Sequence, residues 1–233
     1  MEYSSVFNEL EYKGEASVYQ AEVAIRLGFL RKVYGILSVQ LIFTVITCAS
    51  FMVIEPLKDF VQANNVLIFV ASIATFGVLF GLIFKRHESP VNFYLLGIFT
   101  LLESFTLGTI VTYSDNVVVL KAFIITMMAV VALTIYTAQS TYDYSTWGAS
   151  LMSFLWILIV SGILQIFVRS EELEFVISLG GALIFCGFII FDTHMIMHKL
   201  SPEEYILASI NLYLDIINLF LYILRILEAA NRK

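Results

Sequence analysis

Seven stretches of about twenty mostly apolar residues follow one another along this chain of 233 residues. A helix needs roughly 20 apolar residues to cross the hydrocarbon core of a bilayer. Only 14% of the residues are charged, whereas a soluble domain carries roughly 25%. Backbone groups in lipid must bond within a helix or a closed barrel, and these stretches are too long for strands. The sequence therefore predicts an all-α polytopic membrane protein.

The expected membrane helices span residues 34–54, 66–84, 91–113, 118–137, 149–168, 175–197 and 205–227. The connections between them are short, so consecutive helices should be antiparallel neighbours. We expect an acidic cytosolic segment at residues 1–28 and an integral membrane domain at residues 29–233. The first 25 residues lack the apolar core of a signal peptide, so the first helix should act as its own insertion signal.

Basic residues precede the first helix and follow the second: Arg26, Arg31, Lys32, Lys85 and Arg86. Lys and Arg gather in cytoplasmic loops, so this distribution favours a cytosolic N-terminus. Arg232 and Lys233 favour the side opposite to the one that seven crossings would give. A re-entrant last segment with six crossings is therefore kept as an alternative.

The net charge of −6 comes without a basic stripe, so no nucleic-acid partner is expected. Cys48 and Cys186 both lie in apolar stretches and are interpreted as small buried hydrophobic residues. We expect the chain to be surrounded by the lipid bilayer, and no cofactor is predicted.

Polar side chains recur on the last helix with spacings of 4, 3, 4 and 3: Asn211, Asp215, Asn218, Tyr222 and Arg225. This spacing places them on one side of a helix whose other residues are mostly Leu, Ile or Phe. Such a stripe should not face lipid, so the last helix is predicted to line the interior. For the asparagines and Tyr222, a purely structural hydrogen-bond seam between helices is an equal alternative.

Asp192 lies on the sixth expected helix and Asp215 on the seventh. An acidic side chain in hydrocarbon has a high free energy unless it has a partner, so both need one. In a straight antiparallel hairpin their depths would differ by roughly 8 Å, a gap that helix tilt or an interfacial first turn must close. If they meet, they should share a proton and form a pH sensor. The alternative is that Asp192 only reaches water at the membrane surface.

Glu103 lies midway along the third helix, where it could bind a cation or stay neutral and bond to a neighbouring helix. Together with Asp192, Asp215, Asn211 and Asn218 it supplies the oxygen ligands that Ca²⁺ prefers. No dedicated calcium loop is present, so transient binding of a passing ion is expected, chiefly at Asp192 and Asp215. His194 and His198 lie one turn apart but are better interpreted as interfacial histidines.

Four segments resemble the Bax inhibitor motif, or Lifeguard, family of membrane proteins. They are residues 180–193, which contain Phe191-Asp192-Thr193, residues 214–220 around Asp215, residues 29–34, and residues 103–108 around Glu103. The likeness extends from about residue 29 to the end of the chain.

The resemblance implies a seven-helix bundle of the Bax inhibitor type with the last helix central, in the Golgi or endoplasmic reticulum membrane. It also implies a pH-sensitive calcium leak that lowers store calcium and inhibits apoptosis, with Asp192 and Asp215 as the sensor. Family members use an arginine on the second helix as a latch to the first aspartate. Here residues 66–84 contain no arginine.

Two other functions are compatible with parts of this sequence. The protein could inhibit cell death without conducting ions, by binding membrane proteins of calcium or cell-death signalling through residues 1–24 or its lipid-facing surfaces. Two membrane aspartates also occur in intramembrane proteases. However, Asp192 follows Ile190-Phe191 rather than Gly-x-Gly, and the last helix has no Pro-Ala-Leu-like segment, so no enzyme is expected.

Overall fold

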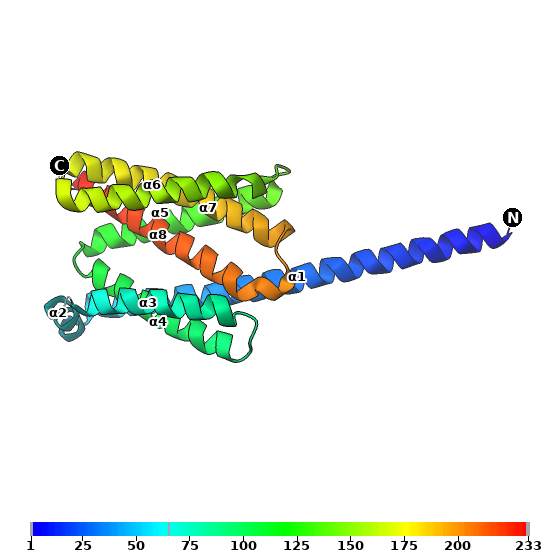
Figure 1. The fold of residues 1–233 in the computed structure, drawn as a ribbon, viewed down its shortest axis with the longest axis horizontal. Coiled ribbons are helices and arrows are strands. Elements are labelled where there is room, and N and C mark those ends of the chain that lie inside the picture. Colours follow the sequence, from blue (N-terminus) through cyan, green and yellow to red (C-terminus); the bar gives the residue numbers. More distant parts are fainter. Residues whose placement is uncertain (1, 65, 232–233) are drawn as a thin grey trace.

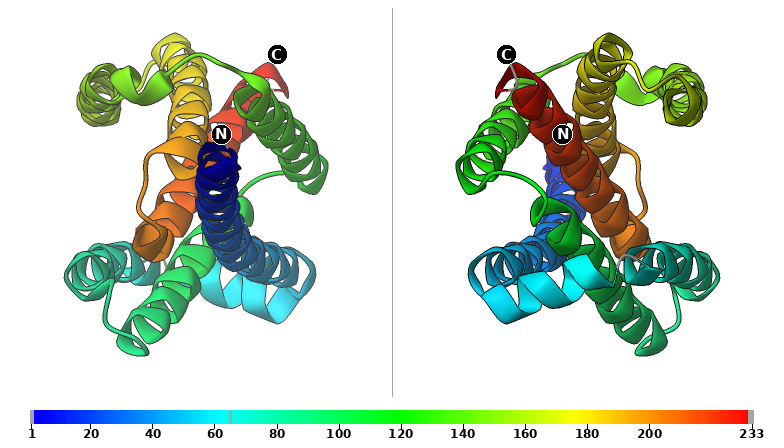
Figure 2. Two further views of the ribbon diagram at one scale, coloured as in Figure 1. Left: turned by 90° about the vertical axis from the view of Figure 1, so that its right-hand side faces the viewer. Right: turned by 90° about the vertical axis from the view of Figure 1, so that its left-hand side faces the viewer.

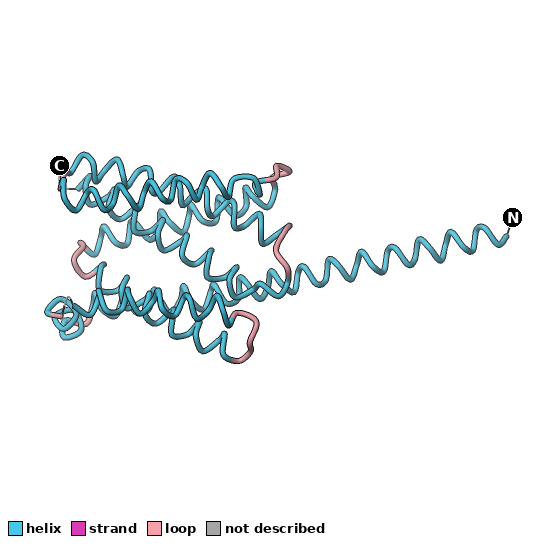
Figure 3. The backbone as a smooth tube through the Cα atoms, in the orientation of Figure 1, coloured by secondary structure: helices cyan, strands magenta, loops and turns pink. Residues whose placement is uncertain are grey.

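The computed structural model describes the backbone of residues 2–64 and 66–231, and side chains from Glu22 onward, and it is almost entirely helical (Figures 1 and 3). The elements are α1 (Glu2–Val53), α2 (Glu55–Ala63), α3 (Val66–Lys85), α4 (Val91–Val111), α5 (Asn116–Gln139), η1 (Tyr144–Trp147), α6 (Gly148–Val168), α7 (Glu171–His198), η2 (Pro202–Glu204) and α8 (Tyr205–Asn231). Seven helices of the described chain are long and apolar enough to cross a membrane. The predicted all-α polytopic bundle is confirmed.

The chain passes back and forth between the two ends of the bundle, and α1 enters at the end opposite to the C-terminal end of α8 (Figure 1). The last helix is uninterrupted over Tyr205–Asn231. The fold thus follows seven crossings rather than a re-entrant last segment. Arg232 and Lys233, which suggested that alternative, lie outside the described residues.

The last helix is central, as predicted. In its most apolar stretch 61% of the residues are buried, against at most 44% in any other span. It packs on α1, α5 and α7, while α4 packs on α1 and α3, and α7 packs on α5 and α6. Figure 2 shows α8 between a group made of α1, α3 and α4 and a group made of α5, α6 and α7. The two groups are therefore held together largely through α8.

Several helices begin earlier than expected, because polar first turns were not counted with the apolar stretches. Ser170 caps α7, whose first turn contains Glu171, Glu172 and Glu174. Asp115 caps α5 by accepting hydrogen bonds from two backbone N–H groups. Glutamates and caps of this kind satisfy the free N–H groups of a helix start. For this reason α7 and α5 begin at Glu171 and Asn116 rather than at residues 175 and 118.

Two helices, α1 and α2, differ from the prediction in extent or in kind. α1 continues well before residue 34, and its candidate membrane span begins at Glu22. The side chains of residues 1–21 lie outside the described residues, so the cytosolic location expected for the acidic residues 1–28, and the binding role considered for residues 1–24, stay predictions. The expected loop after α1 instead forms α2, which buries Val61 while Phe60 is 53% exposed beside Asp59. A short amphipathic helix of this kind suits the membrane interface.

Gly181 on α7 leaves room for a side chain of α8. A Cβ atom there would lie 2.5 Å from the ring of Tyr222 on α8, whose position is fixed by stacking on Phe185 at 5.8 Å between ring centroids. Gly180, the preceding residue, has no atom within 4 Å of such a position. Small residues let membrane helices approach closely. Gly181 therefore sets the distance between α7 and α8.

We expect Gly181→Ala to lower the thermal stability of the protein in detergent, because overpacking costs about 1–3 kcal/mol. Gly180→Ala is the matched control, and it should be neutral or slightly stabilising because alanine favours helix. The midpoint of thermal unfolding measures both effects. Equal midpoints for the two variants would contradict the assignment.

Candidate functional site

The two membrane aspartates meet between α7 and α8. Asp192 and Asp215 are buried, with 9% and 6% of their surfaces exposed. A side-chain hydrogen bond joins the two carboxyl groups. An ionised carboxylate can only accept hydrogen bonds, so this bond requires a proton on one of the two groups. Asp192 is thus placed against Asp215, not at the membrane surface in contact with water alone.

The depth difference between the aspartates is closed by the geometry of the last hairpin. Asp192 lies six residues before the end of α7 at His198, and Asp215 lies ten residues after the start of α8 at Tyr205. Along straight helices these separations are roughly 9 and 15 Å. Figure 1 shows α8 running obliquely across the bundle after the η2 turn. Tilt shortens the advance of α8 per residue, so Asp215 comes level with Asp192.

The rest of the polar stripe on α8 is less uniform than predicted. Asn218 is half-buried and donates a hydrogen bond to the Leu214 carbonyl of its own helix, at 2.8 Å. Asn211 and Arg225 are exposed, so the expectation that the whole stripe lines the interior was wrong for them. Spacing shows that residues share one side of a helix. Which of these residues are covered depends on where neighbouring helices cross that side.

Glu103 is half-buried on α4 and lies within electrostatic range of Tyr213. In the described chain, no hydrogen bond or ion pair links it to either aspartate. Its neighbour Ser104 belongs to a buried network centred on Thr44 of α1. The Thr44 hydroxyl lies 2.8 Å from that of Ser104 and 2.9 Å from that of Tyr213 on α8. Sequence analysis missed this network, because helical spacing does not show which helices are neighbours.

A second polar cluster joins the loop after α5 to the end of α7. One carboxylate oxygen of Asp143 lies 2.9 Å from Nε2 of His194, and the other lies 3.2 Å from Nζ of Lys199. Asp143 also accepts a hydrogen bond from the backbone N–H of Ser145. Hydrogen bonds from Ser145 first, and from Lys199 and His194, hold the pKa of Asp143 well below its usual value.

Arg26 of α1 reaches the same end of α7. Its guanidinium donates hydrogen bonds to the carbonyls of Ile196 at 3.2 Å and Leu200 at 2.8 Å. The last carbonyls of a helix have no partner within it and attract cations. Arg26 therefore fastens the C-terminal end of α7 to α1. From the sequence, Arg26 was expected only to mark the cytosolic side of the first helix.

At the opposite end of the bundle, Arg225 lines a cavity of about 470 Å³ between α7 and α8. Its other polar lining residues are Glu171, Glu172, Glu174 and Glu228. Within the described part of the chain, no three acidic, histidine or cysteine side chains are grouped so as to hold a metal ion. The geometry provides an acidic cavity rather than a cage of ligands.

The fold and its buried carboxyl pair define a seven-helix membrane protein with paired acids between its last two helices. A family model described as inhibitor of apoptosis-promoting Bax1 matches residues 26–232. The chain belongs to this Bax inhibitor family, as its residues suggested.

Known proteins match this chain over nearly its whole length. The chain is 52% identical to the Golgi anti-apoptotic protein of Vaccinia virus (strain Lister), over 99% of this chain and 96% of the relative. It is 48% identical to protein lifeguard 4 of Mus musculus with the same coverage, and 40% identical to Bax inhibitor 1 of Schizosaccharomyces pombe, over 93% of this chain and 82% of the relative.

We expect Asp143→Asn to lower the thermal unfolding midpoint at pH 7, because it removes the charge that Lys199 and His194 face. A lowered carboxyl pKa stabilises the fold above the unfolded value of about 3.9, and this contribution is lost only as the pH falls through the folded value. The difference from wild type should therefore persist down to about pH 4.

Asp59→Asn, on the exposed surface of α2, is the control and should leave the midpoint unchanged. Equal midpoints for both variants at pH 7 would show that the Asp143 cluster does not hold the loop.

Proposed function

We propose that the protein is a pH-sensitive calcium leak channel of an intracellular membrane, Golgi or endoplasmic reticulum, that lowers store calcium and so inhibits apoptosis. Membership of the Bax inhibitor family and the names of the viral and yeast relatives support the anti-apoptotic role. The hydrogen-bonded pair Asp192 and Asp215 is the observation that carries the proposal of a proton-controlled path.

In this proposal the proton shared by the pair is the closing element. With one proton present, the hydrogen bond holds α7 against α8. When both groups ionise, two like charges face each other at low dielectric and repel, so the helices separate there. The second oxygen of Asp215 has no partner within the described residues, which makes it available to a dehydrating cation.

The charge distribution supports entry from the acidic end. The proposed cytosolic N-terminus places the cavity of Arg225 and the α7 glutamates on the lumenal side. Acidic walls raise the local concentration of cations at the mouth of a path. Glu103 and Asn218 would supply further oxygen contacts, and no resident calcium ion is required.

The closed state needs a contact other than the family's arginine latch, because α3 (Val66–Lys85) contains no arginine. We assign this role to Arg26, whose hydrogen bonds hold the Ile196 carbonyl one turn after Asp192. A latch on the backbone keeps the end of α7 in place without neutralising Asp192. The carboxyl pair then stays free to titrate.

In liposomes loaded with a calcium dye, we expect the wild-type leak to rise with pH, by at most about tenfold per unit for a one-proton step. In the Asp215→Asn variant, the asparagine amide should keep the hydrogen bond to Asp192. The amide cannot ionise. The leak of this variant should therefore be low and nearly independent of pH. Asp192→Asn should behave similarly.

Asp59→Asn is the control, because it removes one acid of the described chain far from the pair on α2. A pH profile of Asp215→Asn equal to that of wild type would disprove the sensor. Absence of any calcium leak from correctly folded wild-type protein would favour a non-conducting interaction protein.

A further inference from the structure

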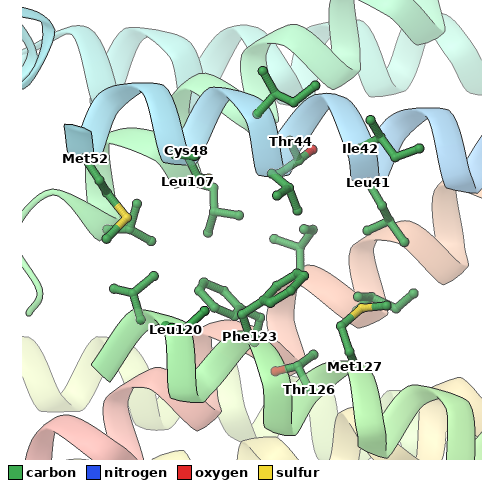
Figure 4. A pocket seen from close by; sticks show the side chains of 18 of the residues that line it. Leu41, Ile42, Thr44, Cys48, Met52, Leu107, Leu120, Phe123, Thr126 and Met127 are labelled. Carbon is green, nitrogen blue, oxygen red and sulfur yellow. The ribbon is translucent and has the colours of Figure 1, made fainter. Parts of the chain in front are cut away.

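A large apolar cavity lies on the other side of α8 from α7. Its volume is about 590 Å³, within the range of roughly 300–1,000 Å³ typical of small-molecule sites. Residues of α1 and α5 form its two walls, and residues of α4 and α8, including Leu107 and Phe220, form its floor. Figure 4 shows Met52, Leu107 and Phe123 around an open space between the two walls.

The cavity offers no free polar group along most of its length. The hydroxyl of Thr44 is bonded to the Gln40 carbonyl at 2.8 Å, and the hydroxyl of Thr126 is bonded to the Ala122 carbonyl at 2.7 Å. The remaining lining is almost entirely aliphatic, aromatic or sulfur-containing, with Asn116 at one end. Buried water needs two to four polar partners, so neither water nor an ion is favoured here.

The cavity opens sideways, toward the hydrocarbon core of the membrane. Ile46 on one wall is 59% exposed and Leu120 on the other is 57% exposed, and both belong to membrane-spanning segments. α1 packs on α4 and α8, while α5 packs on α7 and α8, so the two walls are held apart by the floor. The molecules that surround this opening in a bilayer are lipid chains.

The length of the cavity matches one leaflet. Its lining runs from Leu41 to Val53 on α1 and from Asn116 to Met127 on α5. At 1.5 Å per residue these stretches are about 16–18 Å long, close to half of the hydrocarbon core of about 30 Å. Val53 and Asn116 line the end of the cavity next to α2, and a polar amide at this end suits the boundary between the hydrocarbon core and the headgroups.

We propose that this cavity binds one acyl chain of a phospholipid from the leaflet on the α2 side, with the ester end near Asn116 and the methyl end near Leu41 and Met127. The bound chain fills the space between α1 and α5 and packs on Ile216 and Phe220 of α8. This site does not depend on ion conduction, because it uses the side of α8 that faces away from Asp192.

The test uses full-length protein in phosphatidylcholine liposomes that contain phosphatidylcholine with a diazirine on one acyl chain. After irradiation, mass spectrometry of peptides should find the labels concentrated in residues 41–53 and 116–127. A diazirine near the ester should label close to Asn116, and one near the methyl end should label close to Leu41 or Met127. Even labelling of all lipid-facing helices, including α3 and α6, would overturn the proposal.

Leu120→Trp should reduce labelling of both segments roughly tenfold, equivalent to about 1.4 kcal/mol, because the indole occupies the cavity. Leu101→Trp is the matched control, since Leu101 on α4 is 54% exposed but does not line the cavity. Val45→Trp on the opposite wall is a second filling variant, in case Leu120→Trp fails to fold. Unchanged labelling in a folded filling variant would rule out the site.

Discussion

A carboxyl group in hydrocarbon needs a partner, and the arrangement of this bundle depends on how that need is met. Asp192 and Asp215 bond to each other, which requires that α7 and α8 approach closely over a long contact. Gly181 permits the approach, because it leaves room for the ring of Tyr222. The same contact forces α8 inward, where α1 and α5 can also pack on it. The pairing of the acids thus accounts for the contact between α7 and α8, and further packing on α1 and α5 makes α8 central.

Hydropathy was enough to predict the seven membrane helices, because a span needs length and apolarity and little else. It was not enough for α2, which is short and half polar, nor for the first turns of α5 and α7, whose caps are hydrophilic. The start of α1 was missed for a related reason. A helix that continues beyond the membrane carries no apolar signal there, although nothing in its sequence breaks it.

The pairing of Asp192 with Asp215 could be anticipated, because an unpaired acid in lipid has a high free energy and the two residues lie on adjacent helices. The exposure of Asn211 and Arg225 could not, since it depends on where neighbouring helices cross α8. The contacts of Thr44 with Ser104 and Tyr213 also join segments far apart in the chain. Such contacts follow from the three-dimensional neighbours of each helix, which spacing within one helix does not reveal.

The bond from Arg26 to the end of α7 has a mechanical consequence. α1 is one continuous helix from Glu2 to Val53, so Arg26 lies on the same helix as the first membrane-spanning segment. Arg26 sits on that helix and holds the Ile196 carbonyl, one turn from Asp192. The position of α1 and the backbone position one turn after Asp192 are therefore coupled through this one side chain. Loss of the Arg26 side chain would leave the carbonyls of Ile196 and Leu200 without this partner and separate the end of α7 from α1.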